Sequence, residues 1–117
     1  MTGDQGAGLR WITNSSQIRS ARKKGIFFRG DHMFAWVSQE SVVEPGPPVV
    51  GIVLRRGFKR AVDRNVVRRR LRGCIMELRD LLEPGRVYLI ECKPGAEKVN
   101  YQILVIEVQS LISRGET

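Results

Sequence analysis

Histidine, cysteine and long apolar runs are scarce in this 117-residue chain, and each scarcity excludes a class of protein. The single histidine, His32, and the two cysteines, Cys74 and Cys92, lack the spacing of a zinc site. No apolar run approaches the ~20 residues that span a bilayer, so a membrane partner is not expected. We expect both cysteines to be buried small hydrophobic residues in a reduced, cytoplasmic protein, and His32 to lie on the surface.

Acidic residues are also in the minority, since 20 Lys and Arg residues face 12 Asp and Glu residues and the net charge is +8. The length and the hydrophobic fraction of 42% suit one folded domain with one core. A positive balance of this size is typical of nucleic-acid-binding proteins. The Gly-rich segment 1–8 has no apolar stretch of the kind found in secretion signals, and we expect a disordered leader there. The domain is expected to span 9–114, with 115–117 as a tail.

The pattern along the chain predicts an α+β domain in the order α-β-β-β-α-β-α, a mixed sheet with helices packed on it. Oxygens at 14–16 can cap a helix over 15–24, and Gly25 can end it. Four strands are expected, at 26–28, 32–38, 49–54 and 87–92. The Pro-rich segment 44–48 is expected to form a surface loop. The segment 101–112 is rich in strand-forming residues, but its apolar positions follow helical spacing, and we predict a helix.

The densest feature is the run 55–72, which holds nine of the 20 Lys and Arg residues and one carboxylate, Asp63. At 100° per residue it predicts a helix with an apolar stripe from Val67 to Leu82, beside a row of polar and basic side chains. That row consists of Asn65, Arg68, Arg69 and Arg72, with Arg64 at its border. Guanidinium groups bind phosphate bidentately and stay charged. Because ion pairs of alternating sign are absent from the run, a nucleic-acid-binding surface is favoured over a merely solvated face.

The stretch 50–72 resembles the bacterial ribonuclease P protein subunit. As in that family, an apolar strand ends in a basic pair, and a basic loop with Ala61-Val62 leads into a helix that begins Arg64-Asn65. The similarity extends more loosely over 9–114. The resemblance implies a four-stranded mixed sheet and an unusual left-handed β-α-β crossover, a feature that the residue pattern alone does not reveal.

The resemblance also implies the non-catalytic protein subunit of an endoribonuclease. Such a subunit binds a catalytic RNA and the 5′ leader of precursor tRNA, while the RNA, with bound Mg2+, performs the hydrolysis in 5′-end maturation of tRNA. The residues agree, because one histidine and no clustered carboxylates provide neither catalytic groups nor a metal site. DNA is not an expected partner, because the basic helix carries a broad apolar stripe for docking on its own sheet. A ribosomal or other structural RNA-binding protein is the alternative.

The family's motif assigns RNA contacts to individual positions of this sequence. Its helix matches Arg64, Asn65, Arg68, Arg69 and Arg72, and its basic approach matches Arg55, Arg56, Lys59 and Arg60. Val66 stands where the family usually has a third motif arginine. Arg70 is a candidate to replace part of that contact.

The resemblance further implies a cleft for the leader. Alignment on Gly25 puts Ile18 and Arg22 where the family has aromatic residues on its first helix. Phe34 and Trp36 match other cleft positions and share one face of their strand. Stacking of leader bases on these rings would tolerate any leader sequence. The competing interpretation places both rings in the core, and it has more weight for Phe34 than for Trp36.

Overall fold

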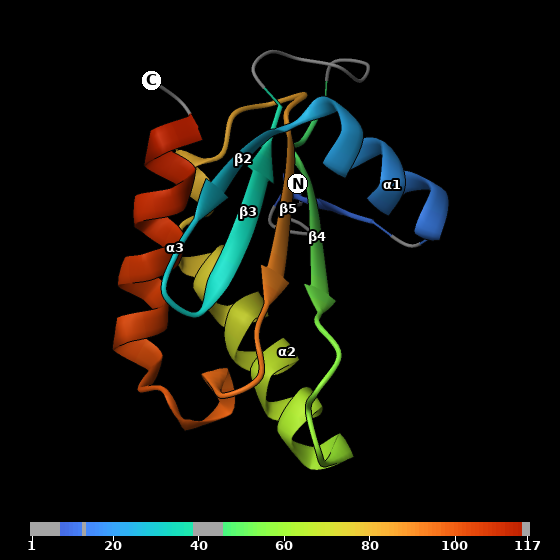
Figure 1. The fold of residues 1–117 in the computed structure, drawn as a ribbon. Helices are drawn as coiled ribbons and strands as arrows, with labels where there is room; N and C mark the ends of the chain where they lie inside the picture. The colour runs from blue at the N-terminus through green and yellow to red at the C-terminus, as the bar shows by residue number, and fades with distance from the viewer. Residues whose placement is uncertain (1–7, 13, 39–45, 116–117) are drawn as a thin grey trace.

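The computed structural model describes residues 8–12, 14–38 and 46–115, in which five strands form one mixed sheet (Figure 1). The strands are β1 (Arg10–Trp11), β2 (Ile26–Arg29), β3 (Met33–Val37), β4 (Val49–Leu54) and β5 (Val87–Cys92). Their order across the sheet is β1-β4-β5-β3-β2. β4 pairs in parallel with β1 and β5, whereas β3 pairs antiparallel with β5 and β2. Parts of the predicted leader (1–8), loop (44–48) and tail (115–117) lie outside the described residues, namely 1–7, 44–45 and 116–117.

The edge strand β1 corrects the expectation of four strands. Its two residues, Arg10 and Trp11, pair with Val49 and Val50 of β4. The backbone N–H of Ile12 extends this pairing by donating to the Val50 carbonyl at 2.9 Å. A strand of two residues is too short to show an alternating pattern, so the sequence did not reveal it.

Three α-helices complete the fold, and α1 and α3 begin where the sequence signals place them, whereas α2 begins at Ala61, before the expected Arg64. The helices are α1 (Ser15–Lys24), α2 (Ala61–Glu77) and α3 (Tyr101–Gly115), with short 3-10 turns η2 (Arg79–Leu81) and η3 (Ala96–Lys98). Asn14 caps α1, since its Oδ1 accepts the N–H of Gln17 at 2.9 Å. α2 ends before the predicted Leu82, and η2 continues its path. The helical interpretation of the C-terminal segment is confirmed by α3. No helix in the described part of the chain is long and apolar enough to cross a membrane.

The core lies between the sheet and the pair α2 and α3, which cover one face, while α1 packs on the other (Figure 1). Alternate residues of β3 and β5 point into this core, namely Met33, Ala35, Val37, Tyr88, Ile90 and Cys92. α2 contributes the predicted stripe, with Val67, Leu71, Cys74 and Ile75 buried. Because side chains alternate along a strand, Phe34 and Trp36 point to the opposite face, which α1 covers only in part.

Candidate nucleic-acid interface

The loop that connects β4 to α2 presents the first group of basic side chains. Buried Phe58 anchors this loop, and its carbonyl accepts a hydrogen bond from Arg64 Nη1 at 3.3 Å. Gly57 adopts a φ of +116°, where an added Cβ would lie 2.9 Å from Pro94 Cγ, so the turn requires glycine. With the loop fixed in this way, the predicted contact residues Arg55, Arg56 and Lys59 are exposed.

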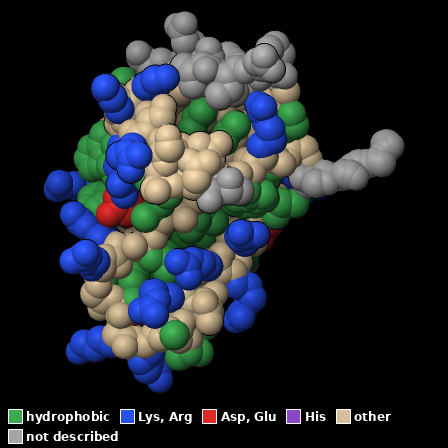
Figure 2. Space-filling model, turned by 90° about the vertical axis from the view of Figure 1, so that its right-hand side faces the viewer, with side chains coloured by type: hydrophobic (Ala, Val, Ile, Leu, Met, Phe, Trp, Pro, Cys, Tyr) green, Lys and Arg blue, Asp and Glu red, His purple; other side chains and the backbone are tan. Residues whose placement is uncertain are grey.

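The predicted row on α2 is exposed to solvent over most of its length. Asn65, Arg68, Arg69 and Arg72 are exposed, and Arg64 is half-buried at the border. Figure 2 shows Lys and Arg side chains spread over this side of the molecule, with few acidic ones between them. A phosphate backbone laid on this side would meet several cations at once.

Arg60 differs from the other predicted contact residues because its carboxylate partner, Asp63, lies within the basic run itself. Its Nε and Nη2 donate to the two Asp63 oxygens at 3.1 and 3.0 Å. This hydrogen-bonded pair raises the pKa of Arg60 and lowers the pKa of Asp63. Asp63 is the only carboxylate in the basic run, so this pairing leaves the charges of the α2 row unopposed within that run.

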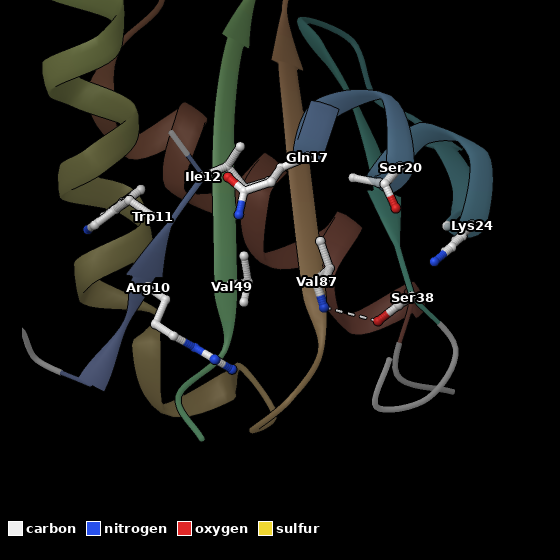
Figure 3. A pocket seen from close by; sticks show the side chains of 11 residues that line it. Arg10, Trp11, Ile12, Gln17, Ser20, Lys24, Ser38, Val49 and Val87 are labelled. Atoms are coloured by element: carbon white, nitrogen blue, oxygen red, sulfur yellow. Dashed lines mark hydrogen bonds between the residues drawn. The ribbon is translucent and has the colours of Figure 1, made fainter. Parts of the chain in front are cut away.

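Trp11 adds an aromatic ring beside the row that sequence reasoning did not assign. β1 turns this side chain toward α2 (Figure 3), and the Arg72 guanidinium lies 4.8 Å from the ring centroid. A guanidinium on an aromatic face keeps its plane and its charge in a defined position. The only sign of this ring in the sequence was a tryptophan in a strand of two residues, which is too short to be recognised as a strand.

Arg70, the candidate to replace part of the contact of the motif arginine that is missing at Val66, is held by backbone carbonyls. Its Nη1 donates to the backbone carbonyls of Glu97 and Val99, at 3.1 Å each. These carbonyls belong to η3 and to the residue that follows it, so Arg70 holds that turn against α2. The sequence spacing does not show this long-range contact, and the replacement of the motif arginine by Arg70 stays a prediction.

The face that α1 covers in part carries a cluster of aromatic rings. Phe27 of β2 lies with its ring centroid 5.5 Å from that of Phe34 and 5.2 Å from that of Trp36. The prediction that Phe34 and Trp36 share a face is confirmed. Phe34 is buried (9% exposed) but outside the core between the sheet and α2 and α3, while Trp36 is half-buried. Phe27 was not singled out from the sequence, although it is 46% exposed beside them.

Guanidinium groups lie over these rings, and one carboxylate connects them. Arg22 of α1 lies 5.4 Å from the Trp36 ring centroid, and Arg55 lies 4.9 Å from that of Phe34. Glu91 of β5, whose side chain is 12% exposed, places Oε1 3.2 Å from Arg22 Nη2 and Oε2 3.5 Å from Arg55 Nε. Two further cations approach the Phe34 ring, Arg29 at 5.9 Å and Lys93 at 5.2 Å.

This arrangement gives each of the two arginines a ring beneath it and a carboxylate beside it. The opposite face of a guanidinium held in this way can accept another planar group. Ile18, which was expected in the same cleft, is half-buried one helical turn before Arg22. Sequence reasoning missed Glu91, whose only signal was its place as the single acid in the strand 87–92.

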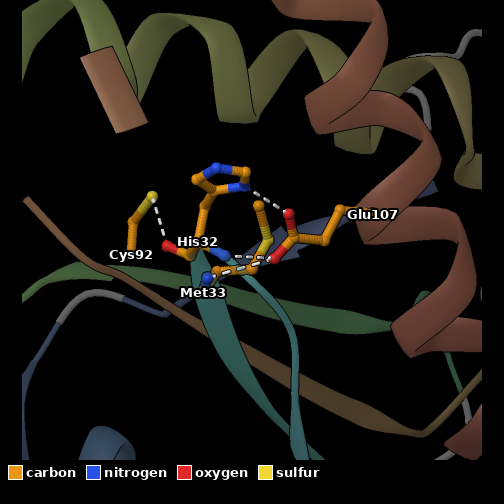
Figure 4. A network of polar contacts seen from close by, with 4 residues as sticks. All are labelled: His32, Met33, Cys92 and Glu107. Carbon is orange, nitrogen blue, oxygen red and sulfur yellow. Dashed lines mark hydrogen bonds and ion pairs between the residues drawn. The ribbon is translucent and has the colours of Figure 1, made fainter. Parts of the chain in front are cut away.

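Histidine and the two cysteines serve the packing of the fold. Glu107 of α3 accepts the backbone N–H groups of His32 and Met33 at 2.7 and 3.1 Å, and its Oε1 lies 2.8 Å from His32 Nδ1 (Figure 4). His32 is therefore half-buried where Glu107 connects α3 to the β2–β3 turn. This half-buried position corrects the expectation that His32 lies on the surface. Cys74 and Cys92 are free and buried, as predicted. Burial raises the pKa of Cys74 to about 11 and that of Cys92 to about 12.

The protein is a basic α+β domain with an arginine row on a helix that packs against its own sheet. Guanidinium groups also lie over aromatic rings beside this row. These are features of a nucleic-acid-binding protein. Comparison with known families is more specific. The family model of ribonuclease P matches residues 9–116. The chain belongs to this family of ribonuclease P protein components.

Individual relatives agree with this membership. The ribonuclease P protein component of Cyanothece sp. is 30% identical over 112 residues, which are 93% of this chain and 81% of that protein. The one from Mycobacterium sp. is 34% identical over 104 residues, or 88% and 86% of the two chains.

Solved structures show the same fold. The RNase P protein of Thermotoga maritima has a TM-score of 0.74 at 15% identity, covering 90% of this chain and 96% of that one. The protein of Staphylococcus aureus also has a TM-score of 0.74, at 12% identity, covering 89% of this chain and 93% of that one. The expected α+β class with a mixed sheet is confirmed.

Proposed function

We propose that this chain binds the catalytic RNA of ribonuclease P and the 5′ leader of precursor tRNA, and so assists 5′-end maturation of tRNA. The observation that carries the proposal is the continuity of two basic surfaces at Arg55. This residue belongs to the exposed loop before α2, and its guanidinium also lies over the Phe34 ring in the cleft. One RNA can therefore lie on α2 while a single strand enters the cleft beside it.

The two surfaces suit different parts of an RNA complex. The α2 row offers exposed guanidinium and amide groups, which suit the phosphates of a folded RNA. The cleft offers planar surfaces, which suit unstacked bases of a single strand. In this chain the leader bases stack on the free faces of the Arg22 and Arg55 guanidiniums, which in turn rest on Trp36 and Phe34.

The hydrolysis itself is assigned to the RNA. Within the ranges that the structure describes, no three His, Cys, Asp or Glu side chains are grouped so that they could hold a metal ion. Because the described side chains form no such group, the proposal assigns Mg2+ to the catalytic RNA, where it would activate water and stabilise the leaving oxygen. The contribution of the protein is to bind and position the substrate.

Three further features belong to the same proposal. The crossover through α2, which connects the neighbouring parallel strands β4 and β5, is left-handed, as the family resemblance implies, whereas about 98% of such connections are right-handed. The site of action is the cytoplasm.

DNA and membranes are not partners, since α2 buries its apolar stripe on the sheet and cannot enter a major groove as a free recognition helix.

Reconstitution tests this function directly. The purified protein is mixed with the catalytic RNA of its own organism and with precursor tRNA that bears or lacks the leader. We expect the protein to increase affinity for the leader-bearing form and to leave mature tRNA nearly unaffected. The protein alone should not cleave precursor tRNA at any Mg2+ concentration. RNA-free cleavage that survives nuclease treatment would contradict the proposal, and tight RNA binding without any preference for the leader would favour a structural RNA-binding role.

A further inference from the structure

A pocket of about 260 Å³ lies on the flank of α1 that faces β1, away from Arg22. Its floor is formed by Val49 of β4 and Val87 of β5, which are paired directly across the two strands. Ile12, Ala21 and Gly25 provide apolar or backbone walls. Figure 3 shows the two valines between Arg10 on one side and Lys24 on the other. The lining residues of this pocket thus do not include Phe34 or Trp36.

The rim of this pocket is polar and carries positive charge. Gln17, Ser20 and Lys24 lie on one stripe of α1, and Arg10 reaches across from β1, where its Nε and Nη2 donate to the Pro47 carbonyl at 2.9 and 2.7 Å. Lys24 is exposed, and no carboxylate in the described part of the chain pairs with it. The described residues that line the pocket include no Asp or Glu. An anionic or electron-rich ligand therefore meets attraction and no repulsion from these side chains.

Ser38 supplies a buried polar group at the bottom of the pocket. It is 2% exposed, and its Oγ accepts the backbone N–H of Val87 at 3.0 Å (Figure 3). A serine hydroxyl also carries a donor. Within the described ranges, no acceptor is found for this O–H. A buried hydroxyl whose donor lacks a partner costs free energy, and a ligand atom with a lone pair would satisfy it.

The pocket adjoins the arginine row through Trp11. This residue lines the pocket on the β1 side, and its ring turns outward to stack with Arg72 of α2. For an RNA bound along α2, the Trp11 side chain would therefore stand between the arginine row and the pocket entrance.

We propose that this pocket binds a single unstacked nucleobase of RNA, with the adjoining phosphate at Lys24. The proposal rests on the proposed RNA-binding function and adds a second base site, on the other flank of α1 from the leader cleft. The volume is just below the range of about 300–1,000 Å³ that drug-sized ligands occupy, so it suits one planar ring. The base ring lies on the Val49 and Val87 side chains, and a ring nitrogen or carbonyl accepts the Ser38 O–H.

Nuclear magnetic resonance of the full chain tests the pocket without any substitution. Adenosine 5′-monophosphate is titrated into labelled protein, and ribose 5-phosphate serves as the base-free control. We expect the nucleotide to shift the methyl signals of Val49 and Val87 and the amide of Gly25, while ribose 5-phosphate shifts signals near Lys24 alone. If both compounds give the same shifts, the site binds only an anion, and if neither shifts the valine signals, the pocket is not a base site. Either result overturns the proposal.

Matched variants then connect the pocket with RNA. Lys24→Ala and Lys23→Ala remove the same charge from neighbouring exposed positions, but only Lys24 lines the pocket. Lys24→Ala should weaken RNA binding about three- to tenfold more than Lys23→Ala, as expected for the loss of one phosphate contact. Val49→Phe, which fills the floor, should abolish the nucleotide-specific shifts, and thermal unfolding shows whether this variant is folded. Equal effects of the two lysine variants would overturn the proposal.

The choice of RNA separates this proposal from the function on which it depends. The affinities for leader-bearing precursor tRNA and for the catalytic RNA are measured separately. The RNA that supplies the base is the one whose affinity falls more with Lys24→Ala. If the wild-type protein binds both RNAs but the lysine variants behave alike, only the base pocket is refuted. If the wild-type protein binds neither RNA, the proposed function itself fails.

Discussion

Replacing Glu91 by glutamine tests the idea that one carboxylate holds the two cleft arginines over their rings. The substitution keeps the shape of the side chain but removes the charge that Arg22 and Arg55 share, at 3.2 and 3.5 Å. The guanidinium edges, which now face Glu91, would become available to phosphate groups. The flat surfaces over Trp36 and Phe34 would no longer be held in place. We therefore expect Glu91→Gln to bind RNA more strongly at low salt but to discriminate less between substrates.

The magnitudes follow from exposure and from the number of charges. The side chains of Arg22 and Arg55 are 39% and 52% exposed, so solvent screens both ion pairs. Each contributes about 0.5 kcal/mol to the free energy of unfolding, and the loss of both should cost about 1 kcal/mol. Each guanidinium that turns to phosphate should steepen the log–log salt dependence by about 0.7 for a single strand. Loss of one stacked base, worth about 1–3 kcal/mol, should reduce the preference for leader-bearing tRNA at least about fivefold.

The assay measures affinity for precursor tRNA with and without its leader, over a series of salt concentrations. Glu77→Gln is the matched control, because it removes the same charge from a side chain that accepts the Tyr101 hydroxyl on the opposite side of the sheet. The control should change neither the salt dependence nor the leader preference. If Glu91→Gln behaves like Glu77→Gln in both measurements, the carboxylate does not position the arginines for stacking, and the reasoning is refuted.

Three further outcomes are expected. Arg68→Ala with Arg72→Ala should weaken binding to the catalytic RNA and flatten its salt dependence by roughly 0.7–0.9 for each lost phosphate contact. An unchanged slope would show that these arginines do not contact phosphate. Trp36→Ala should cost about 1–3 kcal/mol in affinity for leader-bearing tRNA and spare mature tRNA, whereas equal losses with a large fall in melting temperature would place Trp36 in a purely structural role. Because burial raises the pKa of the Cys74 and Cys92 thiols to about 11 and about 12, both stay protonated at pH 8, and a thiol reagent should label them only after unfolding.

The local parts of the fold could be predicted because their signals lie within a few residues of one another. The Asn14 cap and the Gly25 stop define α1, and the apolar run 49–54 coincides with β4. The arginine row of α2 follows from a rotation of 100° per residue, which depends only on helix geometry. β1 escaped prediction because a strand of two residues has no periodicity, and its pairing with β4 depends on contacts 39 residues away in sequence.

The chemistry of the cleft could be predicted only in part, because it is assembled from several elements. The face shared by Phe34 and Trp36 follows from strand geometry, but the arginines above these rings come from α1 and from the loop after β4. Glu91 lies on a fourth segment, and its partners are 69 and 36 residues distant in sequence. Arg70 shows the same limit, since the carbonyls that bind it lie in η3 and just after it.

The position of Arg22 explains how this cleft can work without an aromatic residue on α1. An arginine is flexible, and a flexible cation in a cleft would attract phosphate without offering a defined surface for a base. Here the Arg22 guanidinium lies 5.4 Å from the Trp36 ring centroid and 3.2 Å from Glu91 Oε1. Under the proposed function, it presents a planar surface at the place where the family resemblance puts an aromatic side chain. Because Glu91 cancels only one of the charges of Arg22 and Arg55, the pair keeps a net positive charge. Under the proposed function, these side chains would combine attraction for the RNA backbone with stacking for the bases, and neither interaction would depend on the sequence of the leader.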